Sequence, residues 1–163
     1  MKSILLRSTA IQIACLLIPL STAIASEAQP SAAIDSPLSF AEFYKRPVGP
    51  KGLEPGAKLL ALAGSRVRLD GYIAHGAGPQ PMLAVLAPVP VALGDEDEGL
   101  ADDLPAAVAY LHWTDPNITA ALAGCPRAVR VTGRLELGRL VEADGRSSFV
   151  RLNADSVQCA ADR

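Results

Sequence analysis

The side chains of this chain best suited to hold a soft metal ion are two histidines, one methionine and two cysteines. His75 and His112 supply imidazole nitrogens, Met82 a thioether, and Cys125 and Cys159 thiols. Such nitrogen and sulfur donors suit copper. Their spacing matches no metal-binding motif, so ordinary surface or half-buried histidines are favoured and no cofactor is expected. His75, His112 and Met82 stay as weak candidate ligands.

Motifs for nucleophilic or phosphate chemistry do not occur in the sequence. Neither G-x-S-x-G nor S-x-x-K is present. The glycines at 76, 78 and 94 lack the Gly-Lys pair that follows in a phosphate-binding loop. With two histidines and no recognisable nucleophile, the sequence favours a protein that is not an enzyme.

An acidic run at 95–103 could bind calcium through carboxylate oxygens. Its acids are Asp95, Glu96, Asp97, Glu98, Asp102 and Asp103. The run lacks the alternating ligand spacing and the distal glutamate of an EF-hand loop. A solvated loop is therefore the favoured interpretation.

Several arginines occupy alternate positions of predicted strands and could share one outer face. They are Arg66, Arg68, Arg130, Arg134 and Arg151. A ligand groove for anions, glycans or a nucleic-acid strand could combine the first four with Tyr72 and Trp113. The favoured alternative is a solvated face whose arginines pair with Asp70, Glu136 and Asp155.

Residues 1–25 have the layout of a secretory signal peptide. Lys2 and Arg7 form a basic head, 11–24 is almost wholly apolar, and 23–25 is an A-x-A triplet. We expect cleavage after Ala25 and a periplasmic or secreted protein. The apolar run is too short and interrupted to span a membrane, so no stable insertion is expected after cleavage. A lipoprotein acylated on Cys15 stays as an alternative.

Charge argues against a nucleic-acid partner. The chain of 163 residues carries 15 basic and 17 acidic residues. Loss of Lys2 and Arg7 would leave 13 basic against 17 acidic residues, a net charge of −4. Phosphate neutralisation dominates nucleic-acid binding, so an unknown protein or small ligand is the expected partner.

Cys125 and Cys159 would remain after cleavage and are expected to form a bridge in an oxidising compartment. Cys125 precedes a predicted strand at 128–137, and Cys159 follows another at 148–157. The two positions are symmetric about residue 142, inside the loop expected at 139–146. The cysteines should therefore face each other at the open end of a hairpin, to within a few residues. No C-x-x-C spacing supports a redox role.

Residues 26–64 read as a leader, a short helix and a Pro/Gly-rich connector. Residues 39–42 fit a capping box, with the helix continuing through Tyr44 and ending before Pro47. Prolines and glycines over 47–55 predict an extended or turning connector. Residues 58–63 fit either a helical turn closed by Gly64 or the beginning of a strand.

Residues 65–159 read as a strand-rich domain, followed by a tail at 160–163. Alternating apolar residues predict strands from 65 to 73 and over 128–137 and 148–157, with shorter strands at 82–87 and 106–113. A helix is expected at 116–123. Thr114 or Asp115 would cap it, Pro116 would take its first position, and Gly124 would adopt a left-handed conformation after its last turn.

The predicted order of elements resembles the OB-fold, with three strands, then a short helix, then a two-strand hairpin. We therefore expect a mainly β domain, a small five-stranded OB-like Greek-key barrel with one short helix between strands three and four, plus a short N-terminal helix. Residues 64–72 are also similar to the first strand of uncharacterised exported bacterial proteins, a likeness that implies no activity. A small sandwich is the competing fold.

These observations lead to two expectations about function. The first is an exported, non-enzymatic binding or accessory protein that acts through a β-barrel surface on an unknown ligand. The alternative is a periplasmic metal-handling protein with His, Met and Cys ligands.

Overall fold

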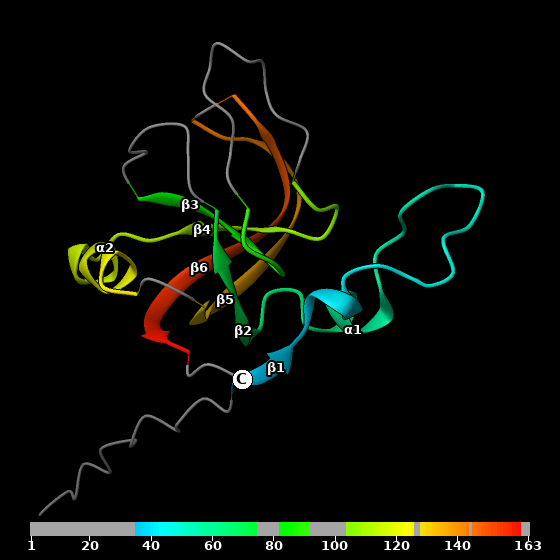
Figure 1. Cartoon of the computed structure of the whole chain (residues 1–163). Helices are drawn as coiled ribbons and strands as arrows, with labels where there is room; N and C mark the ends of the chain where they lie inside the picture. The colour runs from blue at the N-terminus through cyan, green and yellow to red at the C-terminus, as the bar shows by residue number, and fades with distance from the viewer. Residues whose placement is uncertain (1–34, 75–81, 92–103, 126–127, 144, 161–163) are drawn as a thin grey trace, which may run out of the picture. The chain divides into compact units, whose positions relative to one another are not determined.

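The computed structural model describes residues 35–74, 82–91, 104–125, 128–143 and 145–160. The predicted signal peptide, nearly all of the leader, His75, the acidic run and most of the tail lie outside these ranges. The strands are β1 (Ser36–Leu38), β2 (Arg66–Ile73), β3 (Leu83–Ala87), β4 (Ala109–His112), β5 (Ala128–Val141) and β6 (Ser147–Cys159) (Figure 1). The helical elements are η1 (Phe40–Glu42), α1 (Ala57–Ala61) and α2 (Pro116–Ala123).

The described strands form one six-stranded sheet with the order β1-β2-β3-β4-β6-β5. β2 pairs with β5 as well, so the path of pairings from β2 through β3, β4, β6 and β5 returns to β2. β4 and β6 run parallel, whereas β2–β3, β3–β4, β5–β6 and β2–β5 are antiparallel. The expectation of a mainly β fold is confirmed.

The expected count of five strands is wrong, because β1 adds a sixth. Ser36, Pro37 and Leu38 pair in parallel with Val67 to Leu69, beside the part of β2 that β3 does not reach. Three residues are too few to show an alternating pattern, and their partner strand lies about thirty positions further along the chain. The sequence pattern therefore carried no signal for this strand.

The N-terminal capping box is confirmed, but the helix that it begins is a single turn. The Ser39 amide donates to the Glu42 carboxylate at 2.9 Å, and the Ala41 amide donates to the Ser39 hydroxyl at 3.3 Å. The turn ends at Glu42, before the expected limit at Tyr44. Residues 57–61 are helical, and Gly64 follows with a φ of 76°, which settles the ambiguous segment as a helical turn.

Helix α2 begins as the sequence predicts. The Asp115 carboxylate accepts from the Asn117 amide at 2.9 Å, and Pro116 takes the first position. The expected left-handed Gly124 is wrong, because its φ is −78°. The Gly124 amide donates to the Ala120 carbonyl, so the chain stays right-handed as it leads into Cys125.

The core lies on the inner face of the sheet and beneath α2. Alternate residues of the strands fill it, including Val67, Leu69, Leu86, Leu111, Val129, Val131, Leu135 and Leu152. β5 and β6 approach each other so closely that a Cβ at Gly133 would clash with the Asn153 carbonyl and lie 2.8 Å from the Ala154 Cα. Among the residues described, no helix is long and apolar enough to cross a membrane.

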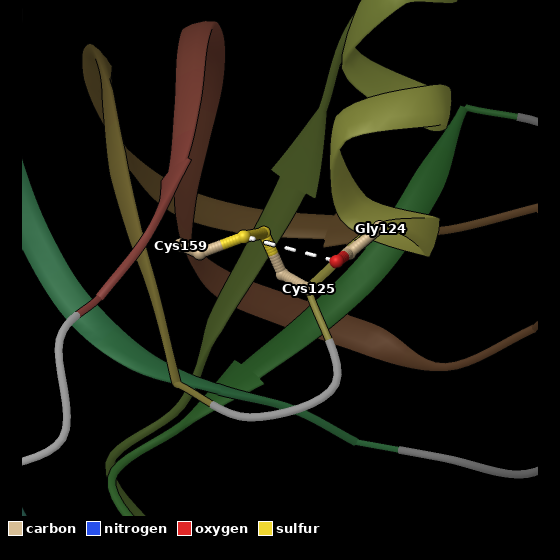
Figure 2. Close-up of a disulfide and its surroundings, with 3 residues drawn as sticks. All are labelled: Gly124, Cys125 and Cys159. Carbon is tan, nitrogen blue, oxygen red and sulfur yellow. Dashed lines mark hydrogen bonds between the residues drawn. A yellow bond between two sulfur atoms is a disulfide. The ribbon is translucent and has the colours of Figure 1, made fainter.

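The predicted bridge between Cys125 and Cys159 is present, with the two Cα atoms 5.2 Å apart (Figure 2). The two cysteines are not direct cross-strand partners, because Cys159 lies opposite Val129. The ladder of β5 and β6 is centred two residues beyond the expected position, and its turn is closed by the Glu142 amide and the Arg146 carbonyl at 2.8 Å. Cys125 reaches Cys159 from the connection between α2 and β5.

Candidate functional site

A row of side chains crosses the outer face of the sheet. Register aligns Leu83 of β3, His112 of β4, Asn153 of β6, Arg134 of β5 and Arg66 of β2 as successive Cα partners. Their neighbours along the strands belong to the core. Because side chains alternate between the two faces of a strand, the row must lie on the face that points away from the core.

A groove of about 520 Å³ covers the β3, β4 and β6 part of this row. Its lining includes Met82, His112, Glu142, Asn153 and Asp155. The groove therefore combines one exposed thioether with an imidazole, an amide and two carboxylates. Ligand sites in proteins commonly join apolar walls to a few such convergent polar groups.

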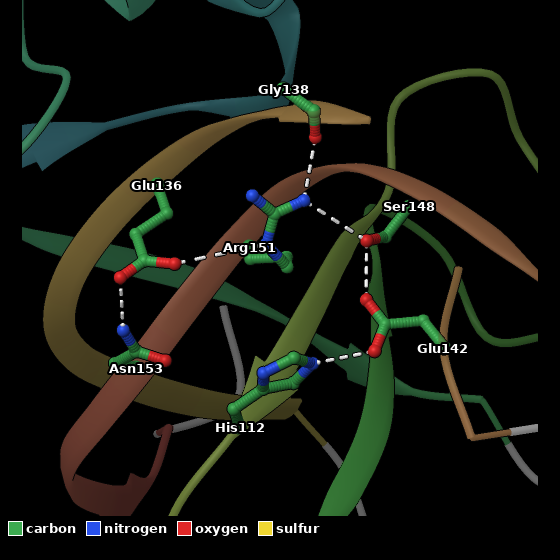
Figure 3. Close-up of polar contacts among 7 residues, drawn as sticks. All are labelled: His112, Glu136, Gly138, Glu142, Ser148, Arg151 and Asn153. Atoms are coloured by element: carbon green, nitrogen blue, oxygen red, sulfur yellow. Dashed lines mark hydrogen bonds and ion pairs between the residues drawn. The ribbon is translucent and has the colours of Figure 1, made fainter. Parts of the chain in front are cut away.

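A buried carboxylate fixes the imidazole in this groove (Figure 3). One Glu142 oxygen lies 2.9 Å from His112 Nε2, and the other accepts from the Ser148 hydroxyl. The Glu142 side chain is only 4% exposed, and Ser148 is fully buried. Both carboxylate oxygens therefore have partners within the protein, and the turn between β5 and β6 is tied to β4.

Arg151 extends this network to the other strands. Its Nη1 donates to the Gly138 carbonyl at 2.6 Å and to the Ser148 hydroxyl at 3.2 Å, while its Nε lies 3.8 Å from Glu136. Asn153 Nδ2 donates to Glu136 at 2.7 Å. Arg151 was expected on an exposed outer face, but it is 8% exposed and holds the curled hairpin in place.

Three of the five predicted arginines are paired with carboxylates, two of them with aspartates. Arg66 pairs with Asp35 and Asp155 at 2.7 and 2.8 Å. Arg130 donates two hydrogen bonds to Asp70 at 2.8 and 2.7 Å, and these bonds and the attraction of the carboxylate raise the pKa of Arg130. With the contact between Arg151 and Glu136, these ion pairs match the favoured alternative of a paired face. Exposed pairs of this kind add about 0–1 kcal/mol each.

Two of the predicted arginines are exposed and have no ion-pair or hydrogen-bond partner among the residues described. They are Arg68 and Arg134. The Arg134 guanidinium lies near Gly64, with its Nη2 3.8 Å from where a Cβ would stand. It therefore does not reach over Asn153 into the groove, whose lining does not include Arg134.

The two aromatic residues of the predicted groove do not form one surface with the four arginines. Trp113 is 8% exposed and lines the groove around His112, and its Nε1 donates to the Thr119 hydroxyl of α2 at 2.8 Å. Tyr72 lies opposite Ala128, so it is a diagonal neighbour of Arg130 across the β2–β5 pair. It is six residues along β2 from Arg66, or about 20 Å at strand spacing. The predicted set therefore does not form a stacking platform.

Two of the weak metal candidates come together, and two important polar residues were missed. Met82 and His112 line the same groove, whereas Cys125 and Cys159 are bonded to each other. No sequence signal marks Glu142, because a carboxylate in a turn is usually solvated. The only signal for Ser148 was its alternation with Val150 and Leu152 on the inner face.

No protein-family model matches the chain. No curated protein matches it either. A DUF3299 family protein from Pseudomonas aeruginosa PAO1 is structurally similar, with 12% identity, a TM-score of 0.51 and coverage of 79% of this chain and 98% of the other. This likeness concerns the β-rich fold alone.

A more distant match is OBody AM3L15 bound to hen egg-white lysozyme, with 22% identity and a TM-score of 0.37. It covers 63% of this chain and 87% of that chain. OBody AM3L09 bound to hen egg-white lysozyme matches at the same identity and TM-score, over 60% and 83%. Similarity at this level carries no inference about binding.

Proposed function

We propose that this chain is an exported, non-enzymatic binding or accessory protein that holds a small ligand or a protein partner in the outer-face groove around His112. The observation that carries the proposal is the convergence of Met82, His112, Asn153 and Asp155 in one concave site. The imidazole in this site is already oriented by a buried carboxylate. A preorganised group of this kind costs less to use in binding.

An OB-like barrel with β1 added to it is the architecture that we propose for the binding domain. The returning path of pairings, the parallel pair β4–β6 and the position of α2 between β4 and β5 support it. In such a barrel, ligands bind at a strand face and at nearby loops. The groove lies at the ends of β3 and β4, beside the turn that joins β5 to β6.

The order of contacts in the polar network favours binding over nucleophilic catalysis. In a Ser-His-Asp triad the histidine contacts the serine hydroxyl directly. Here the Ser148 hydroxyl donates to Glu142, and Glu142 separates it from His112. Ser148 is also fully buried, so it is not presented to the groove.

Export is supported by the bridge between Cys125 and Cys159, because such bonds persist in oxidising compartments. The layout of residues 1–25 supports it independently. Together they favour a protein that works outside the cytoplasm.

A groove-filling substitution tests the proposed function. Ala143 is exposed and lines the groove, so Ala143→Trp should fill the site without disturbing the core. Leu60→Trp is the control, because Leu60 is 53% exposed and lies on α1, outside the groove lining. Native mass spectrometry of gently purified protein and photo-crosslinking in the producing cells would detect small ligands and protein partners.

We expect bound mass or crosslinks in the wild-type protein and the Leu60 variant, and their loss in the Ala143 variant. Identical spectra and identical crosslinks in all three proteins would refute the groove as the binding site.

A further inference from the structure

We propose that the groove binds one copper ion, with His112 Nδ1 and Met82 Sδ as its protein ligands. The inference rests on the proposed function in one respect, namely that this groove is the binding site. It names the class of ligand as a soft metal cation. The metal would be exchangeable cargo rather than a structural component.

His112 is arranged as metal-binding histidines usually are. Its Nε2 is 2.9 Å from the Glu142 carboxylate, and the other ring nitrogen faces away from Glu142 (Figure 3). No partner for Nδ1 occurs among the described parts of the chain. A carboxylate that accepts from one ring nitrogen leaves the other with a lone pair and fixes the ring orientation.

The carboxylate is itself held in place. Glu142 accepts from the Ser148 hydroxyl, and Arg151 donates to that same hydroxyl at 3.2 Å. The imidazole therefore has an ordered support behind it. Outer partners of this kind strengthen metal sites by orienting the ligand before the metal arrives.

Met82 supplies a sulfur donor beside this imidazole. It is adjacent to Leu83, which is the Cα partner of His112, and both Met82 and His112 line the groove. Met82 is 43% exposed and has a φ of 62°, a region that non-glycine residues seldom occupy. A methionine that only filled the core would be buried, whereas Met82 is exposed.

The donor set favours copper over harder cations. Thioether and imidazole suit copper, whereas calcium and magnesium prefer oxygen ligands. The groove carboxylate of Asp155 is already paired with Arg66 at 2.8 Å. No cluster of three or more His, Cys, Asp or Glu occurs in the part of the chain that the structure describes. With only His112 and Met82 as protein ligands, the copper ion would keep open coordination positions, as exchange of the metal requires.

The sulfur content of the chain makes the test unusually direct. The sequence has 2 methionines, Met1 and Met82, and Met1 would leave with the signal peptide. In disulfide-intact mature protein, a copper–sulfur distance in X-ray absorption spectra would therefore report on Met82. Anaerobic titration with Cu(I) against a chromophoric chelator would give the stoichiometry and the affinity. A thiol assay would verify that the bridge is intact.

We expect one equivalent of Cu(I), at least a tenfold loss of affinity in Met82→Leu and loss of binding in His112→Ala. His75→Ala is the matched control for removal of an imidazole and should still bind. Met82→Leu is nearly isosteric and changes an exposed side chain, so its folding should be unaffected.

Three results would each overturn the proposal. They are a copper site without a sulfur neighbour, unchanged affinity in Met82→Leu, and loss of binding in His75→Ala while His112→Ala still binds. The absence of Cu(I) binding to the wild type would also overturn it. In that case the proposed function still stands if the wild-type protein carries bound mass or crosslinks that the Ala143→Trp variant lacks.

Discussion

Replacing Cys125 and Cys159 with alanine tests how far the bridge determines the stability of the domain. The two residues are 34 positions apart. In the chain-entropy model, closing a loop of this length in the unfolded state is worth about 3.8 kcal/mol at 25 °C. For a domain of this size, that loss corresponds to a fall in Tm of roughly 10–15 °C.

Equilibrium urea unfolding of the oxidised wild type, the reduced wild type and the double variant would measure this loss. We expect the reduced wild type and the double variant to unfold at similar urea concentrations, well below the oxidised protein. A difference of less than about 1 kcal/mol between oxidised and reduced protein would contradict the argument.

Removal of the bridge between Cys125 and Cys159 should leave the groove intact. Cys159 is six residues from Asn153 along β6, which is about 20 Å at strand spacing. Copper titration of the folded double variant, with its sulfur signal again restricted to Met82, provides that control. A large change in copper affinity would show that the two ends of β6 are coupled.

Two further predictions concern stability. Gly133→Ala should lower the free energy of unfolding by about 3 kcal/mol or more, because the new Cβ would clash with the backbone of β6. The control is Gly49→Ala, which has open space around it and should change the urea midpoint little. Similar midpoints for the two variants would contradict the packing described. A hydrogen bond from Lys58 and one from the Ser39 amide lower the pKa of Glu42. The contribution of the Glu42 carboxylate to stability is therefore present above about pH 4.5. It is lost as the pH falls through the pKa of Glu42 in the folded protein. Unfolding free energies measured against pH should fall more steeply below pH 4.5 in the wild type than in Glu42→Gln, and parallel curves would refute this.

Local features of the fold followed from local sequence. The capping box at Ser39 and the start of α2 at Asp115 depend on residues within three positions of each other. The alternation along β2 and β5 identified the inner face, because a period of two leaves only one side apolar. These elements were predictable because the interactions that specify them lie within one segment.

Features that depend on distant contacts were not predictable in the same way. β1 needs the edge of β2 that β3 leaves open, and no pattern in three residues indicates that edge. The burial of Arg151 requires the curled hairpin of β5 and β6 around it. Gly124 is right-handed and donates its amide to the Ala120 carbonyl just before the bridged Cys125, a conformation that the residue type at the helix end does not reveal.

The candidate site shows the same division. The sequence identified His112 and Met82 as donors of the right chemistry but offered no spacing that joined them. Register between β3 and β4 brings them to one groove, and a turn thirty residues away supplies Glu142 to orient the imidazole. The same tertiary contacts place Trp113 in the core, which removes it from the predicted arginine groove.

The sequence by itself determined the strand pattern, the α2 helix, the pairing of Cys125 with Cys159 and a set of residues able to do chemistry. Only the tertiary structure decided which of those residues meet, because side-chain partners on a sheet are set by register between strands that are far apart in the chain. The tertiary structure paired Arg66 and Arg130 with aspartates and placed His112, with its buried carboxylate partner, in the groove.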